Sequence, residues 1–415
     1  MPRTVVVTVG DELLLGDTTD SNAARIGRAL ADLGAPVVRR ETVGDDPSAI
    51  GGAVDRALAD GDLVVVTGGL GPTPDDVTRE AVAALLGRPL RLDLELEAAL
   101  RTRYHAAGYG DFPETNLRQA MVPQGARVLA NASGTAPGLA LERDGRWIIL
   151  LQGVPRELEG MLAGPVRDLV MELFCGRLRS PLHRRLRTTG IPESRLAERV
   201  EALLPAARGP VRLAYLPSLR GVELRFTVGG EVDPADAAGW LDRMEAALEE
   251  LGPYLYRGDD LVVAVAESLV RSGRTLAVAE SCTGGLIAKR LTDRAGASRW
   301  FLGGVVAYAD RIKVEQLGVP AETLARVGAV SEEGARAMAA GARSAFGADA
   351  GLGITGVAGP DGGTPEKPVG TVWYAVSVGD RTAAETRVFM GDREAVRERS
   401  AQAALNLLYR MLESG

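Results

Sequence analysis

The sequence predicts an α/β protein in which two α/β sandwich domains with mostly parallel sheets are joined by a small α+β middle domain. Three observations support this class. Buried-strand runs alternate with helix-like segments over residues 1–172, this alternation gives way to paired strands over 173–257, and it returns over 258–415. Alternating strands and helices are typical of a parallel sheet that helices cover on both faces.

The first region contains three strand-then-helix units. The predicted strands are 3–9, 36–43 and 62–69, and the predicted helices are 21–33, 50–59 and one that begins near 76. Ser21 could cap the first of these helices. Ligands of such sheets bind at the carboxyl ends of the strands. The glycine-rich loop after the third strand is therefore the first place to expect a site.

The middle region has the pattern of a small α+β module. Its predicted strands are 182–189, 211–216, 221–228 and a short last one, and its predicted helices are 193–204 and 234–250. It contains no reactive cluster, so we expect it to serve spacing or assembly, and a homodimer is the expected state.

Composition excludes several classes of function. The net charge of −7 argues against a general nucleic-acid binder, because affinity for a phosphate backbone requires clustered cations. No apolar run approaches bilayer length, and the first one is too short for a signal peptide. Two cysteines cannot form a disulfide framework or a cysteine-rich metal site. We expect a cytoplasmic protein without nucleic-acid or membrane partners.

The stretch AESCTGG (279–285) places Ser281 on a predicted strand-to-helix turn. A serine nucleophile needs a base, yet both histidines lie far upstream. Only three of the 48 basic residues are lysines. Lys313 is the best candidate by elimination, because Lys289 is expected to point to solvent and Tyr308 stands at the end of the neighbouring strand. The amine must lose its proton well below its reference pKa of about 10.4 to act as a base.

Neighbouring groups complete this predicted site. The backbone N–H groups of Thr283, Gly284 and Gly285 could hold an oxyanion or a phosphate. Cys282 is the rival nucleophile, although a cysteine here is often a small buried hydrophobe. A glycine-rich loop follows at 353–370.

Two features downstream could serve the same site. Thr355 stands near the start of the glycine-rich loop, which allows a ligand to approach the backbone closely. Arg393 and Arg397 share one face of the last helix and suit a phosphate or carboxylate. A solvent-exposed helix face is the alternative interpretation of the two arginines.

The first region offers a second site. VTGGLGPTPDDVTRE (66–80) follows the third strand with glycines and then Asp75 and Asp76 at a predicted helix start. Successive loop N–H groups form an anion site, and carboxylates can hold a hard divalent ion against a phosphate. The alternative is that one aspartate merely caps the helix. GDELLLGDTTDSN (10–22), with Glu12, and NASGTAPG (131–138) lie at the same sheet edge.

The last region resembles the C-terminal domain of the CinA family. The resemblance rests on AESCTGG, GGVVAYADRIKVEQLGV, GAVSEEGARAMA, GITGVAGPDGGTPEKPVGTVW and GDREAVRERSAQAAL, in this order. It implies an amidase, without a cofactor, that deamidates nicotinamide mononucleotide to nicotinate mononucleotide. The implied catalytic residues are Ser281, Tyr308 and Lys313, and the implied substrate-binding residues are Thr283, Gly284, Gly285, Thr355, Gly356, Gly359 and Arg393.

The first region resembles a molybdopterin-binding-like domain of MoaB and MogA type, on GGLGPTPDD above all. In CinA-family proteins such a domain looks like a metal-dependent ADP-ribose pyrophosphatase. The implied substrate-binding residues are Gly68, Gly69, Gly71, Thr73, Ser133, Gly134 and Thr135, and the implied ligands of a divalent metal ion are Asp75, Asp76 and Glu12. The family commonly has lysine where Arg118 stands.

Together these resemblances imply a bifunctional hydrolase of pyridine-nucleotide recycling, with domains 1–172, 173–257 and 258–415. Its expected small-molecule partners are nicotinamide mononucleotide and ADP-ribose. Two alternatives belong to other classes of function. The first region could bind molybdopterin without hydrolysing anything, or the protein could be an accessory factor in competence or DNA damage.

Overall fold

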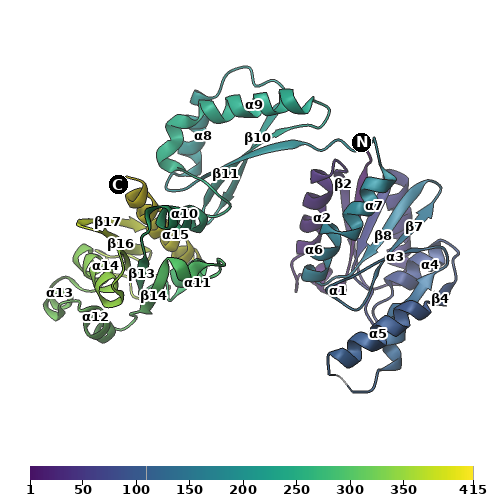
Figure 1. The fold of residues 1–415 in the computed structure, drawn as a ribbon, viewed down its shortest axis with the longest axis horizontal. Coiled ribbons are helices and arrows are strands. Elements are labelled where there is room, and N and C mark those ends of the chain that lie inside the picture. The colour runs from purple at the N-terminus through teal and green to yellow at the C-terminus, as the bar shows by residue number, and fades with distance from the viewer. Residues whose placement is uncertain (109, 415) are drawn as a thin grey trace. The chain divides into compact units, whose positions relative to one another are not determined.

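The computed structural model describes residues 1–108 and 110–414 (Figure 1). The chain forms two compact units. The first contains residues 1–182 and 228–237, and the second contains 183–227 and 238–415. The positions given below for each residue refer to its own unit.

A six-stranded sheet forms the centre of the first unit, in the order β2-β1-β3-β8-β7-β6 (Figure 1). Its strands are β1 (Thr4–Val9), β2 (Val37–Val43), β3 (Leu63–Thr67), β6 (Arg127–Leu129), β7 (Gly138–Arg143) and β8 (Arg146–Leu151). The four strands β2, β1, β3 and β8 pair in parallel, whereas β7 and β6 are antiparallel additions. The carboxyl ends of the parallel strands therefore form one edge.

Helices cover both faces of this sheet. The helices of the first unit are α1 (Asp11–Leu15), α2 (Ser21–Asp32), α3 (Pro47–Asp60), α4 (Thr78–Leu85), α5 (Leu94–Ala106), α6 (Pro155–Ala163) and α7 (Pro165–Leu173). The unit also contains a 3-10 turn, η1 (Glu114–Ala120), and a small two-stranded ribbon of β4 (Leu90–Leu92) and β5 (Met121–Pro123). Val6 and Val65 pack with α2, α6 and α7, while Val5, Val7 and Val64 pack with α3 and α4. Successive side chains of each buried strand point alternately to the two helical layers. Because both sides are covered by helices, the sequence of the strand is an unbroken apolar run.

The middle module belongs mostly to the second unit. Its elements are β9 (Leu182–Thr188), α8 (Glu193–Leu203), β10 (Val211–Ser218), β11 (Gly221–Val228), α9 (Pro234–Ala247), η2 (Glu249–Tyr254) and β12 (Leu255–Tyr256). The four strands form one sheet in the order β10-β11-β9-β12. The predicted α+β pattern of this region is confirmed.

The C-terminal domain contains a five-stranded sheet in the order β14-β13-β15-β16-β17. Its strands are β13 (Leu276–Glu280), β14 (Phe301–Val306), β15 (Ala350–Gly356), β16 (Thr371–Val378) and β17 (Arg381–Val388). Strand β13 lies between β14 and β15 and pairs in parallel with both, whereas β16 and β17 are antiparallel. The parallel pairing predicted for this sheet is therefore found among β13, β14 and β15, the strands next to AESCTGG, and not among β16 and β17.

The helices of this domain also form two layers. They are α10 (Leu261–Ser272), α11 (Leu286–Thr292), α12 (Asp310–Leu317), α13 (Ala321–Val327), α14 (Glu332–Phe346) and α15 (Arg393–Glu413), with a 3-10 turn η3 (Ala297–Arg299). Leu276 and Val278 pack with α10 and α15, while Ala277 and Ala279 pack with α14 on the other face. Gly353 allows the close approach of α14, because a Cβ there would lie 2.5 Å from the Ala335 carbonyl oxygen.

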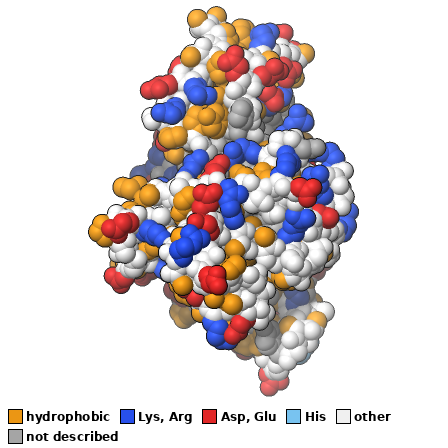
Figure 2. Space-filling model, turned by 90° about the vertical axis from the view of Figure 1, so that its left-hand side faces the viewer, with side chains coloured by type: hydrophobic (Ala, Val, Ile, Leu, Met, Phe, Trp, Pro, Cys, Tyr) orange, Lys and Arg blue, Asp and Glu red, His pale blue; other side chains and the backbone are white. Residues whose placement is uncertain are grey.

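The predicted α/β class is confirmed, and two details at helix ends differ from expectation. Asp20, not Ser21, caps α2, because its carboxylate accepts the Ala23 N–H and Ser21 is already the first helical residue. The helix predicted from about 76 begins at Thr78. In the described part of the chain, no helix has the length and apolarity needed to span a bilayer. On the face drawn in Figure 2, basic and acidic side chains are interspersed.

Candidate functional site

The carboxyl edge of the C-terminal sheet brings three predicted site segments together. Glu280 at the end of β13 is in register with Val306 of β14 and Ile354 of β15. The Ala307 N–H donates to the Glu280 carbonyl at 2.8 Å, and the Ser281 N–H donates to the Ile354 carbonyl at 3.0 Å. Ser281 therefore lies between the end of the strand that leads to Tyr308 and the end of the strand that leads to Thr355.

Strand alternation decides which face the serine serves. Side chains alternate between the two faces of a strand, and Ala277 and Ala279 face α14. Ser281 continues this series, so its hydroxyl is expected on the side of α12 and α14, where Lys313 resides. The alternation therefore predicts that the nucleophile and the amine lie on one side of the sheet.

Glu280 belongs to the opposite series and has a structural role. Its carboxylate is 1% exposed and accepts hydrogen bonds from the N–H groups of Gly285 at 3.1 Å, Ile287 at 3.0 Å and Ala288 at 2.8 Å. A buried charge that receives three backbone donors is well satisfied. Glu280 therefore fixes the start of α11 directly after the serine turn.

These contacts correct one expectation about the turn. The Gly285 N–H is bound to Glu280, and the Gly284 N–H donates to the Ser281 carbonyl at 3.1 Å. Two of the three N–H groups predicted to hold an anion are therefore already used within the protein. The sequence did not reveal this competition, because a carboxylate at a strand end has no fixed partner in a motif.

The environment of Lys313 differs from that of the other two lysines. Lys313 is 2% exposed, and its Nζ donates to the Tyr308 carbonyl at 3.0 Å and to Asp310 Oδ1 at 3.1 Å. Lys289 instead forms an exposed ion pair with Asp293, as predicted. Lys367 donates to the Val327 carbonyl. Lys313 is therefore the lysine buried at the edge that carries Ser281.

Asp310 is a functional neighbour that the sequence did not identify. It forms an ion pair with Lys313, and its own side chain is mostly exposed. A general base must be free of its proton, so this ion pair has to open before Lys313 can act as one. Asp310 therefore fixes the position of the amine at the sheet edge.

Arginines at the start of α15 clamp the same edge. Arg393 donates to the Gly359 carbonyl at 2.6 Å and to the Tyr308 hydroxyl at 3.1 Å. Arg397 donates twice to the Thr283 carbonyl, at 3.2 and 2.7 Å. The predicted pair on one helix face thus connects the serine turn, the glycine loop and the tyrosine. The alternative of a purely solvent-exposed face is excluded.

The remaining predicted groups of this site differ in their surroundings. Tyr308 is 61% exposed, so its ring stands open to a ligand. Thr355 and Thr283 are buried, and the Thr283 hydroxyl has no hydrogen-bond partner among the described residues. Gly356 is required by packing, because a Cβ would lie 2.6 Å from a methyl of Val372.

Cys282 belongs to the apolar core rather than to the site. It is 5% exposed and packs in the cluster that contains Val278 and Leu405. Burial, reinforced by the charge of Glu280, raises the pKa of its thiol to about 12. A thiol held protonated in this way is a poor nucleophile, which favours Ser281.

The edge of the first sheet forms an open pocket of about 380 Å³. Seven of the residues predicted for this site line it: Glu12, Gly68, Gly69, Gly71, Asp75, Asp76 and Thr135. They come from the loops that follow β1, β3 and β6, which the chain brings together at this edge. The expectation that three distant stretches share one edge is therefore confirmed for these residues.

Carboxylates dominate this pocket. Asp45, which the sequence did not suggest, lines it together with Glu12, Asp75 and Asp76. Burial, with repulsion from Asp11, Glu12 and Asp75, raises the pKa of Asp45 despite its hydrogen bond from the Asp11 N–H. Such crowding of like charges favours a cation. Over residues 1–108 and 110–414, however, no group of three or more His, Cys, Asp or Glu side chains is arranged to hold a metal ion.

The aspartates shape the glycine loop and do not cap the next helix. Asp76 accepts hydrogen bonds from the N–H of Thr73 at 2.9 Å and from its hydroxyl. No side chain caps α4, whose N-cap residue is Val77. Arg118 donates to the carbonyls of Thr73 and Asp76 and to Glu80. It fixes the loop from outside the pocket, a role that needs several donors and that a lysine fills less well.

The third loop is arranged differently from the prediction. Asn131 accepts hydrogen bonds from the N–H groups of Ser133 at 3.1 Å and Gly134 at 2.9 Å. Neither residue lines the pocket, whereas Thr135 does. A Cβ at Gly134 would overlap a carboxylate oxygen of Glu157, so the glycine is needed for packing. Ser133 and Gly134 therefore support the pocket wall rather than line the pocket.

Two glutamines add polar groups that the sequence did not single out. Gln119 and Gln152 are buried and line the pocket, and the side-chain oxygen of each has no partner among the described residues. Buried polar atoms are nearly always hydrogen-bonded. These two oxygens are thus available to donors of a bound molecule. Isolated glutamines carry no motif, which is why the sequence gave no signal for them.

Comparison with known proteins assigns each part of the chain. Family models match residues 5–171 ("Probable molybdopterin binding domain"), 183–256 ("Damage-inducible protein CinA KH domain") and 258–412 ("CinA C-terminal domain"). A CinA-like protein of Gemmatimonas aurantiaca is 48% identical over 98% of this chain and 95% of its own length. A CinA-like protein of Frankia casuarinae is 44% identical over 99% of this chain and 96% of its own.

A solved structure covers a smaller part of the chain. The protein CinA with unknown function from Thermoplasma acidophilum is 41% identical, covers 40% of this chain and 97% of its own, and has a TM-score of 0.38.

Proposed function

Because this chain belongs to the CinA family, we propose that its two sheet edges are two hydrolytic sites of pyridine-nucleotide recycling. The C-terminal edge would deamidate nicotinamide mononucleotide, and the edge of the first unit would hydrolyse ADP-ribose. The first assignment rests on Lys313, which is buried and follows the strand that pairs with the end of β13, directly before Ser281. No histidine lies in this domain to replace it.

The amidase mechanism follows from these groups. Ser281 Oγ attacks the carboxamide carbon while the free amine of Lys313 takes the hydroxyl proton. The C–N bond then breaks, the departing nitrogen receives that proton, and ammonia leaves an acyl-enzyme. Water attacks the ester, Lys313 again takes a proton, and nicotinate mononucleotide and the Ser281 hydroxyl are released. The Lys313 amine must be free of its proton when Ser281 attacks, and Asp310 holds the Lys313 side chain in place before that step.

Substrate recognition would use the charged clamp around the turn. Arg397 contacts the serine turn at the Thr283 carbonyl and Arg393 contacts Tyr308, and guanidinium suits the 5′-phosphate of a mononucleotide. The exposed ring of Tyr308 is positioned by Arg393 and offers a surface for the pyridine ring.

The test is ammonia release from nicotinamide mononucleotide by the full chain. Ser281→Ala is expected to abolish turnover, because the acyl-enzyme cannot form, and Cys282→Ala is expected to keep most of it. Both proteins should show the same far-ultraviolet circular dichroism as the parent. Retained turnover in Ser281→Ala would reject the covalent mechanism.

The pocket of the first unit fits a divalent cation and a pyrophosphate. Glu12, Asp75 and Asp76 offer oxygen ligands, Asp45 adds a further carboxylate, and no arginine or lysine is among the described residues that line the pocket. A divalent ion would supply charge neutralisation on the phosphate oxygens. Fewer than three clustered protein ligands is consistent with Mg²⁺, which keeps waters and substrate phosphates as ligands. The free oxygens of Gln119 and Gln152 would accept hydrogen bonds from ribose hydroxyls.

Release of AMP from ADP-ribose in the presence of Mg²⁺ or Mn²⁺ tests this assignment. We expect activity in the parent chain and a strong loss in Asp75→Asn, while ammonia release is unchanged. Binding of a pterin without AMP formation under excess metal would instead support the second candidate, which the match to a molybdopterin-binding model suggests.

A further inference from the structure

The second unit contains a cavity of its own, separate from the pocket of the first unit. This cavity shares no residue with the proposed amidase site. Its volume is about 360 Å³, which is in the range of small-molecule sites. The middle module supplies one wall, from the loop before α8 (189–193) and the turn between β10 and β11 (217–222). The C-terminal domain supplies the other wall, from β16, β17 and α15. We refer to this space as the junction cavity.

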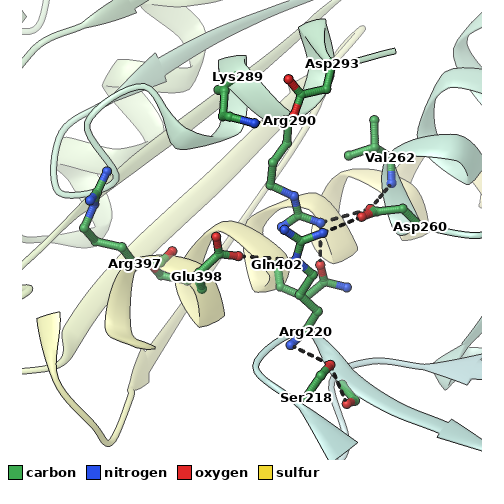
Figure 3. A network of polar contacts seen from close by, with 12 residues as sticks. Ser218, Arg220, Asp260, Val262, Lys289, Arg290, Asp293, Arg397, Glu398 and Gln402 are labelled. Atoms are coloured by element: carbon green, nitrogen blue, oxygen red, sulfur yellow. Dashed lines mark hydrogen bonds and ion pairs between the residues drawn. The ribbon is translucent and has the colours of Figure 1, made fainter. Parts of the chain in front are cut away.

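A network of polar contacts, partly exposed at Arg220 and buried at Gln402, holds the two walls together (Figure 3). Arg220, in the turn between β10 and β11, forms ion pairs with Asp260 at 2.7 Å and Glu398 at 3.3 Å. Gln402 of α15 donates to the Thr189 hydroxyl at 3.3 Å and accepts from Arg290 at 2.9 Å. The walls are therefore fixed by specific contacts, and the junction cavity is a built feature rather than a loose gap.

Guanidinium groups without carboxylate partners face the junction cavity. Arg387 of β17 and Arg399 of α15 both line it, and neither forms an ion pair with any described residue. Arg399 donates only to the Met390 carbonyl. The carboxylate of Glu385, by contrast, is already bound to Arg410 at 2.6 Å and to the Tyr374 hydroxyl at 3.0 Å. Glu193 adds one carboxylate to the lining, so Arg387 and Arg399 leave a net positive charge in this space.

The pKa of Glu385 agrees with this assignment of charge. Burial alone would raise it, but the hydrogen bond and charge of Arg410, the bond from Tyr374 and the charge of Arg387 outweigh burial and lower it. Glu385 therefore stays ionised and hydrogen-bonded to Arg410 and Tyr374, while Arg387, which acts on it only through its charge, keeps its N–H donors for an added anion.

A buried amide without a partner also lines the junction cavity. Asn406 is 7% exposed, and its side chain makes no hydrogen bond with any described residue. Its Nδ2 lies only 3.0 Å from where a Cβ of Gly190 would stand, so the backbone approaches it closely. The polar atoms of Asn406 are not among the buried side-chain atoms that lack a partner, so they are open to the cavity and can hydrogen-bond a bound molecule.

We propose that the junction cavity binds a small phosphate monoester of mononucleotide size. Arg387 and Arg399 would hold the phosphate, because guanidinium groups bind phosphate oxygens in pairs. Asn406 and the ring of Phe389 would contact the body of the ligand. The enclosed space and the overall charge of −7 favour a small ester over a nucleic-acid strand.

The test is calorimetric titration of the full chain with uridine monophosphate at low salt. This probe is neither a substrate nor a product of the reactions proposed above, so the result does not depend on them. The double variant Arg387→Gln/Arg399→Gln is expected to bind at least about tenfold more weakly, because charge-assisted hydrogen bonds are lost. The matched control is Arg326→Gln, which removes an exposed arginine of α13 that pairs with Glu333, and it should bind as the parent does.

A second variant separates loss of binding from loss of folding. Asn406→Ala removes an amide that makes no hydrogen bond within the protein, so the unfolding temperature should change little while affinity falls about two- to tenfold. Uridine should bind far more weakly than its monophosphate, and inorganic phosphate should compete only at higher concentration. Three outcomes would overturn the proposal: unchanged binding in the double variant, equal binding of phosphate and ester, or tighter variant-sensitive binding of short single-stranded RNA.

Discussion

The two candidate active sites lie at sheet edges that are built in the same way but carry opposite charge. Each follows a buried parallel strand, β3 in one unit and β13 in the other, and each continues into a glycine turn. In the first unit the carboxylates of Glu12 and Asp45 face a shared open pocket. In the second unit the carboxylate of Glu280 turns to the opposite face and binds backbone N–H groups.

This difference shows how a common edge acquires different chemistry. Where carboxylates crowd an open pocket, the added partner must be a cation, and a cation in turn recruits phosphate. Where the carboxylate is used to cap a helix, the groups left at the edge are Lys313, Arg393 and a hydroxyl. Such an edge suits an uncharged amide beside a phosphate and attack by oxygen.

The largest test of this comparison replaces the buried amine. Lys313→Arg should lower ammonia release by about a thousandfold or more, because guanidinium keeps its proton and cannot act as a base. ADP-ribose hydrolysis should be unchanged, since that pocket belongs to the other unit. Lys313→Met serves as a second variant in case the larger arginine disturbs the fold, and a normal circular dichroism spectrum identifies which of the two is interpretable. Turnover retained by Lys313→Arg would reject lysine as proton acceptor.

A smaller effect is expected when the buried carboxylate of Glu280 is replaced by a neutral amide. Glu280→Gln should reduce the free energy of unfolding by about 2–3 kcal/mol, because charge-assisted hydrogen bonds to a buried carboxylate are replaced by neutral ones. Denaturant titration measures this loss. Glu315→Gln, which breaks only an exposed ion pair with Arg311, is the control and should cost less than about 1 kcal/mol. Equal losses in both variants would show that Glu280 does not hold α11.

The rival nucleophile gives a third test, smaller again. Cys282→Ala should cost about 1 kcal/mol of stability, the scale expected for removing a small buried side chain, and should leave ammonia release nearly unchanged. Because the pKa of Cys282 is raised to about 12, its thiol is protonated from pH 6 to 9, and iodoacetamide should label only the exposed Cys175 in the folded chain. Labelling of Cys282 at pH 8 would contradict its assignment to the core.

Local patterns predicted most of the fold. The alternation of apolar runs and helix-like segments located strands such as β1 and β13 within a residue or two, because fully buried parallel strands are nearly continuous in hydrophobic residues. Helix ends were less certain. Asp20 and Ser21 are both good caps, and only the observed contact with Ala23 separates them.

The candidate sites were predictable where a residue type was scarce and hidden where it was common. Lys313 emerged because the chain has three lysines and no nearby histidine. Asp310, Asp45 and Gln152 did not, because acidic and amide side chains are frequent and their importance depends on which distant segments meet. The use of the Gly285 N–H by Glu280 is likewise a tertiary contact that no local spacing encodes.

The smallest expected effect tests whether the pocket of the first unit is short of positive charge. Asp45→Asn retains an oxygen that can accept the Asp11 N–H, now at 3.0 Å, and removes only the charge. The pKa of Asp45 is raised above 3.8 by burial and repulsion, so the folded state binds the proton more tightly than the unfolded state does. Ionisation therefore costs stability as pH rises, and the variant should be more stable at pH 7 by under about 0.5 kcal/mol after solvent screening.

That gain should vanish below pH 3.8, where the carboxyl is protonated in both states. Mg²⁺ should stabilise the parent more than the variant, because its positive charge offsets the negative charge of the Asp45 carboxylate. Asp168→Asn, an exposed change on α7, is the matched control in denaturant titrations at pH 7 and pH 3. A variant that is less stable than the parent at pH 7 would mean that the pocket already compensates its carboxylates, and the contrast between the two edges would then rest on Lys313 alone.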